Sequence, residues 1–359
     1  MRIGINARTF SVDEPDGAVQ AARKLTYCLG NRKDVDLVLY GDSQLSTEFP
    51  NANRVCSTGF FSNSPFFGVI WERVVLPSLV DAEEIDVLLC PNGNAPPTRV
   101  GCPIVTYVHD VNAQKGMSSG VHRLYRRLIV PFGIKRSDAV ITVSEFSKAE
   151  ISEYLPVENE SIHVVYNGID EFYLTDDCSE YMNLPDKYLL YVGAMNPRKN
   201  VQRLIEAYSE IRDHIPHELV LIGPQNKSVY KKLDLDGMSE DIITPGFLPK
   251  AQLKYAYENA DGFIYPSLYE GFGIPPLEAM ACGTPVVASN RSSLPEILNG
   301  WGNLVDPTDI SAISKAMMNV ATSDTQLKDK KGMKNHAQRF TWEQASEDLL
   351  GILESVIDR

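Results

Sequence analysis

Short apolar segments alternate with helical patterns along the whole chain, and this alternation limits the possible folds more than any other feature. A first series of β-compatible segments covers residues 2–5, 35–39, 86–90, 104–108, 139–143 and 162–165, and a second covers 188–192, 219–222, 242–244, 262–265 and 285–288. Strands that alternate with helices form a parallel sheet with helices packed on its faces. The sequence therefore predicts the α/β class, with two doubly wound Rossmann-like domains that face each other across a cleft.

The length of the chain supports the same division. At 359 residues it exceeds the size at which a single hydrophobic core usually stops growing. We expect a first domain at residues 1–172, a linker without clear periodicity at 173–186, and a second domain at 187–340. A last helical pattern at 341–359 follows both series and is a candidate to pack across the junction.

Composition excludes some classes of function. The net charge of −13 argues against general nucleic-acid binding, which needs a basic surface. The six cysteines are scattered, so the sequence predicts neither a zinc motif nor a disulfide framework, and reduced thiols in the cytoplasm fit best. The first residues enter a strand pattern directly and no apolar run approaches the length of a membrane span. We expect a cytoplasmic protein, with peripheral attachment to the membrane as an open alternative.

A glycine-rich turn between two glutamates is the strongest candidate site. Glu270 and Glu278 bracket this turn, which follows the apolar segment 262–266, and Pro275 and Pro276 suit the first turn of a helix. In a parallel sheet such a loop lies at the carboxyl end of the strands, where ligands bind. The start of the helix favours an anion, typically a phosphate, and the carboxylates would accept hydrogen bonds from hydroxyls. The alternative is ordinary helix punctuation.

Two cations follow the first strand of the second series. Arg198 and Lys199 would clamp a diphosphate, with a bidentate fork from Arg and a point charge from Lys, and would neutralise a departing nucleotide without a metal. The alternative is a solvated basic pair before a helix. Because no Asp-x-Asp cluster stands in a suitable loop, we predict no metal site.

Two residues of the first series are weaker candidates. His109 ends the segment 104–108, at a carboxyl end, where it would donate to a substrate hydroxyl or handle a proton; a lone His is more often structural. Gly17 lies in the first turn and would let the backbone approach a substrate, although turns need glycine anyway.

Residues 111–137 carry cations and no acidic residue, in a chain that is acidic as a whole. Arg123, Arg126 and Arg127 are interleaved with apolar residues, which suggests contact with anionic lipid headgroups or with a lipid-phosphate acceptor. A core helix with a basic outer face explains the pattern equally well, since Pro131 and Gly133 interrupt it.

With these motifs together, the chain resembles the retaining nucleotide-sugar glycosyltransferases of family four, which have the two-domain GT-B fold, and in particular bacterial and archaeal mannosyl- and glucosyltransferases. The resemblance runs along most of the chain. It is carried by Tyr265-Pro266-Ser267, Glu270-Gly271-Phe272-Gly273, Glu278-Ala279-Met280, Gly283-Thr284-Pro285-Val286-Val287, Leu294-Pro295-Glu296, Pro197-Arg198-Lys199-Asn200, Val143-Ser144-Glu145-Phe146-Ser147 and Asn167-Gly168.

The resemblance implies roles for residues in the second series. Glu278 would bind the ribose of the donor nucleotide, and Glu270 would lie beside the donor sugar near its anomeric carbon. The diphosphate would be held by the two cations and by two backbone amides, and the base would lie near the backbone after the third strand. These groups belong to Arg198, Lys199, Gly273 and Ile274 for the diphosphate, and to Gly246 and Phe247 for the base.

In the first series the resemblance places His109 near the donor sugar and Gly17 in a glycine-rich loop on the acceptor side. The chain departs from the family here, since Ala18 stands where many members have a second glycine. The family also often has a basic residue shortly after the strand that ends at Gly193, where this chain has Ala194 and Met195.

The implied activity is transfer of a hexose, with mannose or glucose as the first guess, from a nucleoside diphosphate sugar to an acceptor hydroxyl with retention. The implied partners are the donor and a glycan or lipid-linked acceptor, in glycan, glycolipid or polysaccharide assembly, with no metal or other cofactor. An epimerase or phosphorylase on the same fold, and a non-catalytic nucleotide-binding subunit, remain alternatives. An NAD enzyme is disfavoured because the first turn lacks a G-x-G-x-x-G pattern.

Overall fold

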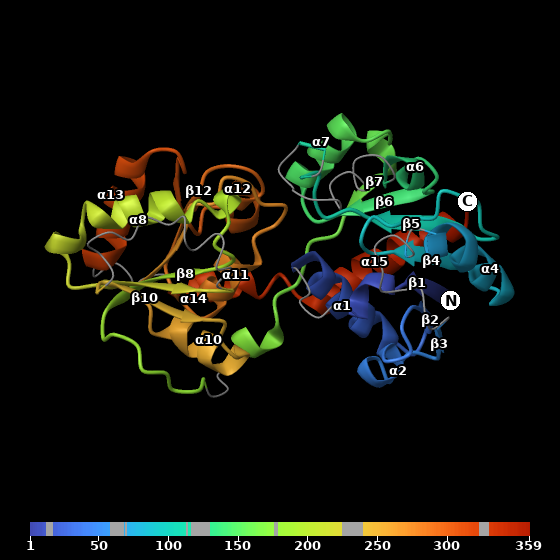
Figure 1. The fold of residues 1–359 in the computed structure, drawn as a ribbon, viewed down its shortest axis with the longest axis horizontal. Helices are drawn as coiled ribbons and strands as arrows, with labels where there is room; N and C mark the ends of the chain where they lie inside the picture. The colour runs from blue at the N-terminus through green and yellow to red at the C-terminus, as the bar shows by residue number, and fades with distance from the viewer. Residues whose placement is uncertain are drawn as a thin grey trace. The chain divides into compact units, whose positions relative to one another are not determined.

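A computed structural model describes residues 1–11, 17–57, 68, 70–112, 114–115, 130–175, 179–224, 240–322 and 330–359. The chain divides into two compact units, each built on one parallel sheet (Figure 1). Unit 1 comprises Met1–Gly168 and Trp342–Arg359, and unit 2 comprises Ile169–Thr341.

The sheet of unit 1 has seven strands in the order β3-β2-β1-β4-β5-β6-β7, and each neighbouring pair is parallel. Its strands are β1 (Arg2–Asn6), β2 (Asp36–Tyr40), β3 (Arg54–Cys56), β4 (Val87–Cys90), β5 (Ile104–Tyr107), β6 (Ala139–Thr142) and β7 (Ile162–Val164). Its longer helices are α1 (Gly17–Gly30), α4 (Leu76–Ala82), α7 (Glu145–Tyr154) and α15 (Trp342–Ile357), and its shorter ones are η1 (Arg8–Ser11), α2 (Leu45–Glu48), the π-helical η2 (Trp71–Val75), α6 (Val130–Ile134) and η3 (Asn159–Ser161).

The sheet of unit 2 has six parallel strands in the order β10-β9-β8-β11-β12-β13. Its strands are β8 (Tyr188–Val192), β9 (Glu218–Ile222), β10 (Ile242–Gly246), β11 (Gly262–Tyr265), β12 (Val286–Ser289) and β13 (Asn303–Val305). Its helices are η4 (Glu171–Tyr173), η5 (Pro197–Lys199), α8 (Val201–Ser209), η6 (Arg212–His214), α10 (Lys250–Glu258), α11 (Ile274–Ala281), α12 (Leu294–Leu298), α13 (Ile310–Thr322) and α14 (Lys330–Ala337).

Both sheets therefore grow outward from their first strand in two directions, which is the doubly wound arrangement that the apolar series predicts. The central strands are buried along their length, as expected for strands covered on both faces. The sequence pattern missed β3 and β13. Both are three-residue edge strands with partly exposed side chains, so they lack the apolar signature of a central strand.

The division between the units differs from the boundaries expected from the sequence. Unit 2 begins at Ile169, so residues 169–172 belong to it and not to the first domain. The start of the expected linker is anchored to α10, because the buried Lys254 donates through Nζ to the carbonyl oxygens of Phe172 (2.9 Å) and Thr175 (2.7 Å). These contacts are tertiary, so residues 170–175 show no local periodicity.

The last helix belongs to unit 1. Figure 1 shows α15 beside α1, and the two helices pack against each other. The amphipathic pattern of α15 buries Leu349 and Leu353 in that unit. The chain thus returns to its first unit after completing the second.

Candidate active site

Unit 2 brings the main candidate residues together at the carboxyl edge of its sheet. The growth of this sheet reverses between β8 and β11, which pair directly, so this is the switch point at which α/β sheets bind ligands. Arg198 and Lys199 follow β8, and Glu270 follows β11. Arg198 and Lys199 thus contact Glu270, although about seventy positions separate them from it in the sequence.

Glu270 is the centre of this cluster. Its side chain is 8% exposed, and its Oε1 lies 2.6 Å from Nζ of Lys199 and accepts from Oγ of Ser267 at 2.5 Å. Its Oε2 lies 3.2 Å from Nη1 of Arg198. Burial alone would raise the pKa of Glu270, but the Lys199 ammonium and the Arg198 guanidinium outweigh it and hold that pKa below its ordinary value. Glu270 is therefore a carboxylate tied on both oxygens.

Lys199 is almost fully enclosed, with 12% of its side chain exposed. Its Nζ also lies 2.5 Å from the hydroxyl of Tyr265. Burial lowers its pKa, although Glu270 favours the charged form. With both cations and the carboxylate charged, the cluster keeps one net positive charge, which suits an anionic ligand.

The turn after β8 is held by its own side chains. Asn196 precedes η5 and caps it, because its side chain accepts from the backbone N–H of Lys199 at 3.2 Å. Asn200 adopts a left-handed backbone conformation, and its side chain donates to the carbonyls of Pro266 (3.0 Å) and Pro307 (2.7 Å). These bonds tie the η5 turn to the loops that follow β11 and β13.

The turn between the glutamates leads directly into α11. Gly273 has a φ of 112°, which favours glycine, and a Cβ there would lie 2.6 Å from Cδ2 of Leu294, so that side chain would have to shift. Pro275 and Pro276 have no N–H, which leaves Gly273 and Ile274 as the donors at the start of α11. The helix start thus presents two adjacent backbone donors near the cationic cluster.

Two serines that the sequence reasoning missed hold this turn from behind. The fully buried Ser293 donates through Oγ to the carbonyls of Phe272 (2.7 Å) and Glu270 (3.1 Å). Ser292 accepts through Oγ from the backbone N–H of Glu270 at 3.0 Å. The only sequence signal for them was their position just before the Leu-Pro-Glu motif, which does not indicate which groups they bind.

Three glycines end neighbouring strands at the same edge. Gly193, Gly223 and Gly246 follow or end β8, β9 and β10, and backbone hydrogen bonds link Gly193 to Ile222 and Gly223 to Gly246. A Cβ on Gly223 would lie 2.1 Å from the carbonyl oxygen of Gly193, so the strands approach too closely there for any side chain. Beyond them Phe247 is 81% exposed. At this part of the edge, glycine backbone without side chains lies beside the exposed ring of Phe247.

Glu278 lies one turn into α11, in a different environment from Glu270. Its Oε2 accepts from the hydroxyl of Tyr257 at 3.0 Å. Burial raises the pKa of Glu278 to about 7, against a smaller opposing effect of the Tyr257 hydrogen bond. The two glutamates therefore differ: one is an ion-paired carboxylate, and the other titrates near neutral pH.

Unit 1 positions its candidates at the carboxyl edge of its own sheet. His109 follows β5 and donates through Nε2 to the carbonyl of Pro91 at 3.0 Å, while its ring stacks on Tyr107 with centroids 4.5 Å apart. Gly17 begins α1, and a Cβ there would meet none of the described atoms within 4 Å, so packing against the described residues does not require glycine. The candidate patch residues Arg123, Arg126 and Arg127 lie outside the described residues.

Three structural features are absent from the described part of the chain. No group of three or more His, Cys, Asp or Glu side chains is arranged there to hold a metal ion. No helix there combines the length and apolarity needed to cross a bilayer. The described cysteines, Cys28, Cys56, Cys90, Cys102 and Cys282, form no disulfide with one another.

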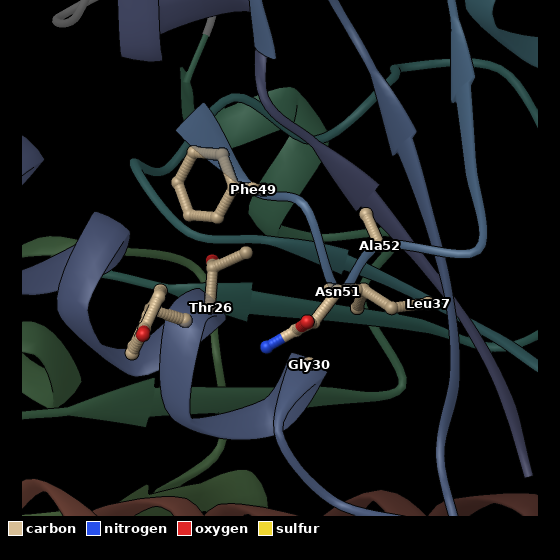
Figure 2. A pocket seen from close by; sticks show the side chains of 7 residues that line it. Thr26, Gly30, Leu37, Phe49, Asn51 and Ala52 are labelled. Carbon is tan, nitrogen blue, oxygen red and sulfur yellow. The ribbon is translucent and has the colours of Figure 1, made fainter. Parts of the chain in front are cut away.

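A small pocket lies elsewhere in unit 1. Figure 2 shows it between the end of α1, the start of β2 and the loop before β3, at the amino edge of the sheet. It is lined by Thr26, Tyr27, Gly30, Leu37, Phe49, Asn51 and Ala52. None of these side chains is charged, so the pocket offers no group for acid–base or anion chemistry.

The chain matches two family models in succession. Residues 15–171 match Glycosyltransferase Family 4, and residues 179–340 match Glycosyl transferases group 1. The structure is also similar to a sucrose-phosphate synthase from Thermosynechococcus elongatus, with a TM-score of 0.77 and 17% identity over 100% of this chain and 99% of the other. The chain therefore belongs to the family-4-like glycosyltransferases with the GT-B fold.

Two more proteins are similar to this chain. Escherichia coli O-antigen chain mannosyltransferase B is 34% identical over 218 residues, which are 57% of this chain and 57% of that protein. The match thus spans little more than half the length of this curated relative. Anabaena HepE, solved in complex with UDP and glucose, has a TM-score of 0.72 and 20% identity over 99% of this chain and 100% of the other.

Proposed function

We propose that this protein transfers a hexose from a nucleoside diphosphate sugar to an acceptor hydroxyl, with retention at the anomeric carbon and without a metal ion. The similarity to an O-antigen mannosyltransferase makes mannose the first donor sugar to test and glycan assembly the expected context. The complex of HepE with UDP and glucose supports a nucleotide-sugar donor.

The observation that carries this proposal is the cluster of Glu270 with Lys199 and Arg198 at the switch point of unit 2. A carboxylate bound by two cations, with a lowered pKa, is a weak base and a weak nucleophile. Glu270 therefore suits a role in orienting the donor sugar and stabilising positive charge at its anomeric carbon. On this route the departing phosphate, on the same face as the acceptor, takes the acceptor proton, and retention follows.

The departing diphosphate would be stabilised by fixed groups. The cluster keeps one net positive charge, and the backbone amides of Gly273 and Ile274 at the start of α11 would donate hydrogen bonds to the phosphate oxygens. Arg198 and Lys199 would thus stabilise the negative charge of the leaving diphosphate, as a divalent cation does in other enzymes. We expect activity to persist in excess EDTA, and a requirement for added Mg²⁺ or Mn²⁺ would contradict this part of the proposal.

The nucleoside would lie along the remaining edge. Glu278 would accept hydrogen bonds from the ribose hydroxyls, and the base would lie against the open backbone at Gly246 with Phe247 beside it. By family resemblance, His109 would reach the donor sugar and Gly17 would lie on the acceptor side.

The acceptor would be a glycan or a lipid-linked glycan, and the protein would act in the cytoplasm with peripheral contact to an anionic membrane through Arg123, Arg126 and Arg127. Sedimentation with acidic liposomes tests this contact. Charge reversal at these three positions should abolish it, and undiminished binding would exclude the membrane role.

The main test is a panel of nucleoside diphosphate sugars, each incubated with lipid-linked acceptors, with product mass as the readout. Replacement of Glu270 by Gln should keep nucleotide binding and lower transfer by about 10² or more, the lower end for a positioned catalytic group. Glu218→Gln, at the amino end of β9, is a matched control that should leave transfer unchanged. Near wild-type turnover in Glu270→Gln would remove Glu270 from the chemistry.

The same panel separates the other functions open to this fold. Conversion of the donor without an acceptor would indicate an epimerase, and a requirement for inorganic phosphate would indicate a phosphorylase. Nucleotide binding without any product would indicate a non-catalytic subunit.

A further inference from the structure

We propose that Tyr257 is a positioning residue for the donor ribose: its hydroxyl holds one oxygen of Glu278 so that the other oxygen faces the ribose hydroxyls. This inference rests on the proposed function, in which Glu278 binds the ribose.

The contact joins two helices of unit 2. Tyr257 lies in α10, Glu278 lies in α11, and the phenol oxygen is 3.0 Å from Oε2. Within the described part of the chain, Oε1 of Glu278 accepts no hydrogen bond. One oxygen is thus engaged from behind and the other remains available to a ligand.

The ring of Tyr257 cannot move without disturbing the core. It is fully buried, and it packs edge-on against Phe263 and Tyr173, with centroids 5.6 Å and 5.9 Å away. The hydroxyl of Thr284 also donates to the backbone carbonyl of Tyr257. The phenol oxygen is therefore held in one place, and it fixes the carboxylate that it contacts.

When Glu278 is charged, its carboxylate can only accept, so the Tyr257 hydroxyl donates in this contact. Burial raises the pKa of Tyr257 well above its ordinary value, so the phenol keeps its proton and donates. A donor stabilises the charged form of Glu278, against the burial that disfavours it. Since a charged carboxylate accepts from ribose hydroxyls and a protonated one accepts less well, Tyr257 supports the form that binds.

A buried tyrosine needs some acceptor, and a backbone carbonyl would satisfy it equally well. Tyr188 and Tyr208 in the same unit do donate to backbone carbonyls. Tyr257 donates instead to a side chain placed at the ligand-binding edge. This choice of acceptor separates a positioning role from simple satisfaction of a buried hydroxyl.

The test replaces Tyr257 by Phe, which keeps the ring and removes only the hydroxyl. The probes are UDP and GDP, each compared with its 2′,3′-dideoxy analogue, and binding is measured by calorimetry. For whichever nucleotide the wild type binds, Tyr257→Phe should bind about three- to tenfold more weakly, the size of one ordinary hydrogen bond, while binding of the dideoxy analogue stays unchanged. In a transfer assay the donor KM should rise with little change in kcat.

Two controls accompany this variant. Tyr255→Phe makes the same change two residues away in α10, where the ring packs on Tyr181, and should leave binding unchanged. In a double-mutant cycle, Tyr257→Phe should add nothing once Glu278 is Ala, which removes the acceptor of the Tyr257 hydroxyl. Thermal melting of each variant checks that the fold is kept.

The pH dependence supplies a readout that a purely structural role would not move. Loss of the Tyr257 hydroxyl, which donates a hydrogen bond to Glu278, raises the pKa of Glu278. The pH midpoint at which nucleotide binding weakens should therefore shift to higher pH. The groups that act on Glu278 from the surrounding elements are Tyr257 and Lys250 of α10, Asp170 and Tyr173 around η4, and Cys282 after α11. All of these except Tyr257 are unchanged in the variant.

The outcomes are distinct. Equal weakening of the nucleotide and its dideoxy analogue, or no weakening of either, overturns the positioning role while the proposed function stands. Failure of the wild type to bind any nucleoside diphosphate overturns the donor site itself, and with it this inference.

Discussion

The affinity for a nucleoside diphosphate should depend on the protonation of Glu278. Calorimetry between about pH 5.5 and 8.5 measures this affinity at each pH. Burial raises the pKa of Glu278 to about 7, from an ordinary value of 4.5. Ribose hydroxyls donate to the charged form, which predominates above that pKa. Each pH unit below it adds about 1.4 kcal/mol for removing the proton, so affinity should fall by up to about tenfold per unit. Above pH 8 the affinity should reach a plateau.

The phosphates of the ligand also titrate in this range, so the comparison needs a reference. Glu278→Gln cannot ionise, and its residual pH dependence reports the phosphates alone. A 2′,3′-dideoxy nucleotide with the wild-type protein is a second reference, because it lacks the hydroxyls that Glu278 would bind. Identical pH profiles for wild type and Glu278→Gln, or affinity that rises as the pH falls below 7, would refute the reasoning.

Three further outcomes follow from the same site. The folded-state pKa of Glu278 lies above its unfolded value, so the charged form opposes folding above pH 7. Glu278→Gln should therefore raise the free energy of unfolding by up to about 3 kcal/mol at pH 8 and change it little at pH 4. Denaturant melts at both pH values measure this difference. Gly273→Ala should lower the free energy of unfolding by about 1–3 kcal/mol and weaken UDP or GDP binding, since the left-handed φ and the 2.6 Å approach to Leu294 both oppose a Cβ. An unchanged melting temperature would contradict this. Phe247→Ala should leave the melting temperature unchanged, because the ring is 81% exposed, and should weaken nucleotide binding by about fivefold if it stacks on the base, whereas equal loss for ribose 5-phosphate would exclude stacking.

Local patterns were enough to predict the architecture. An apolar run followed by an amphipathic helix has the same meaning wherever it occurs, because burial of both faces of a strand leaves a continuous apolar segment. The two parallel sheets and their central strands followed from this rule. The edge strands β3 and β13 did not, since a half-exposed strand of three residues carries no such signal.

Part of the site could also be predicted from the sequence. Gly273, Pro275 and Pro276 mark a turn into a helix start by their own backbone restrictions, and such a start after a strand lies at the ligand-binding edge. The charges of Arg198 and Lys199 could be seen, although their partner could not. The same limit applied to the domain boundary at Ile169, which depends on the anchoring of the following residues to Lys254.

The sequence by itself determined two doubly wound units and the loops that carry polar groups, because strand and helix periodicity and turn chemistry act over a few residues. Only the tertiary structure decided what these groups do to one another. The pairing of Glu270 with Lys199, the serines behind the turn and the hydrogen bond from Tyr257 to Glu278 all join residues from different loops or helices. Burial and charge at these contacts act through space, so they make one glutamate an ion-paired carboxylate and leave the other to titrate near neutral pH.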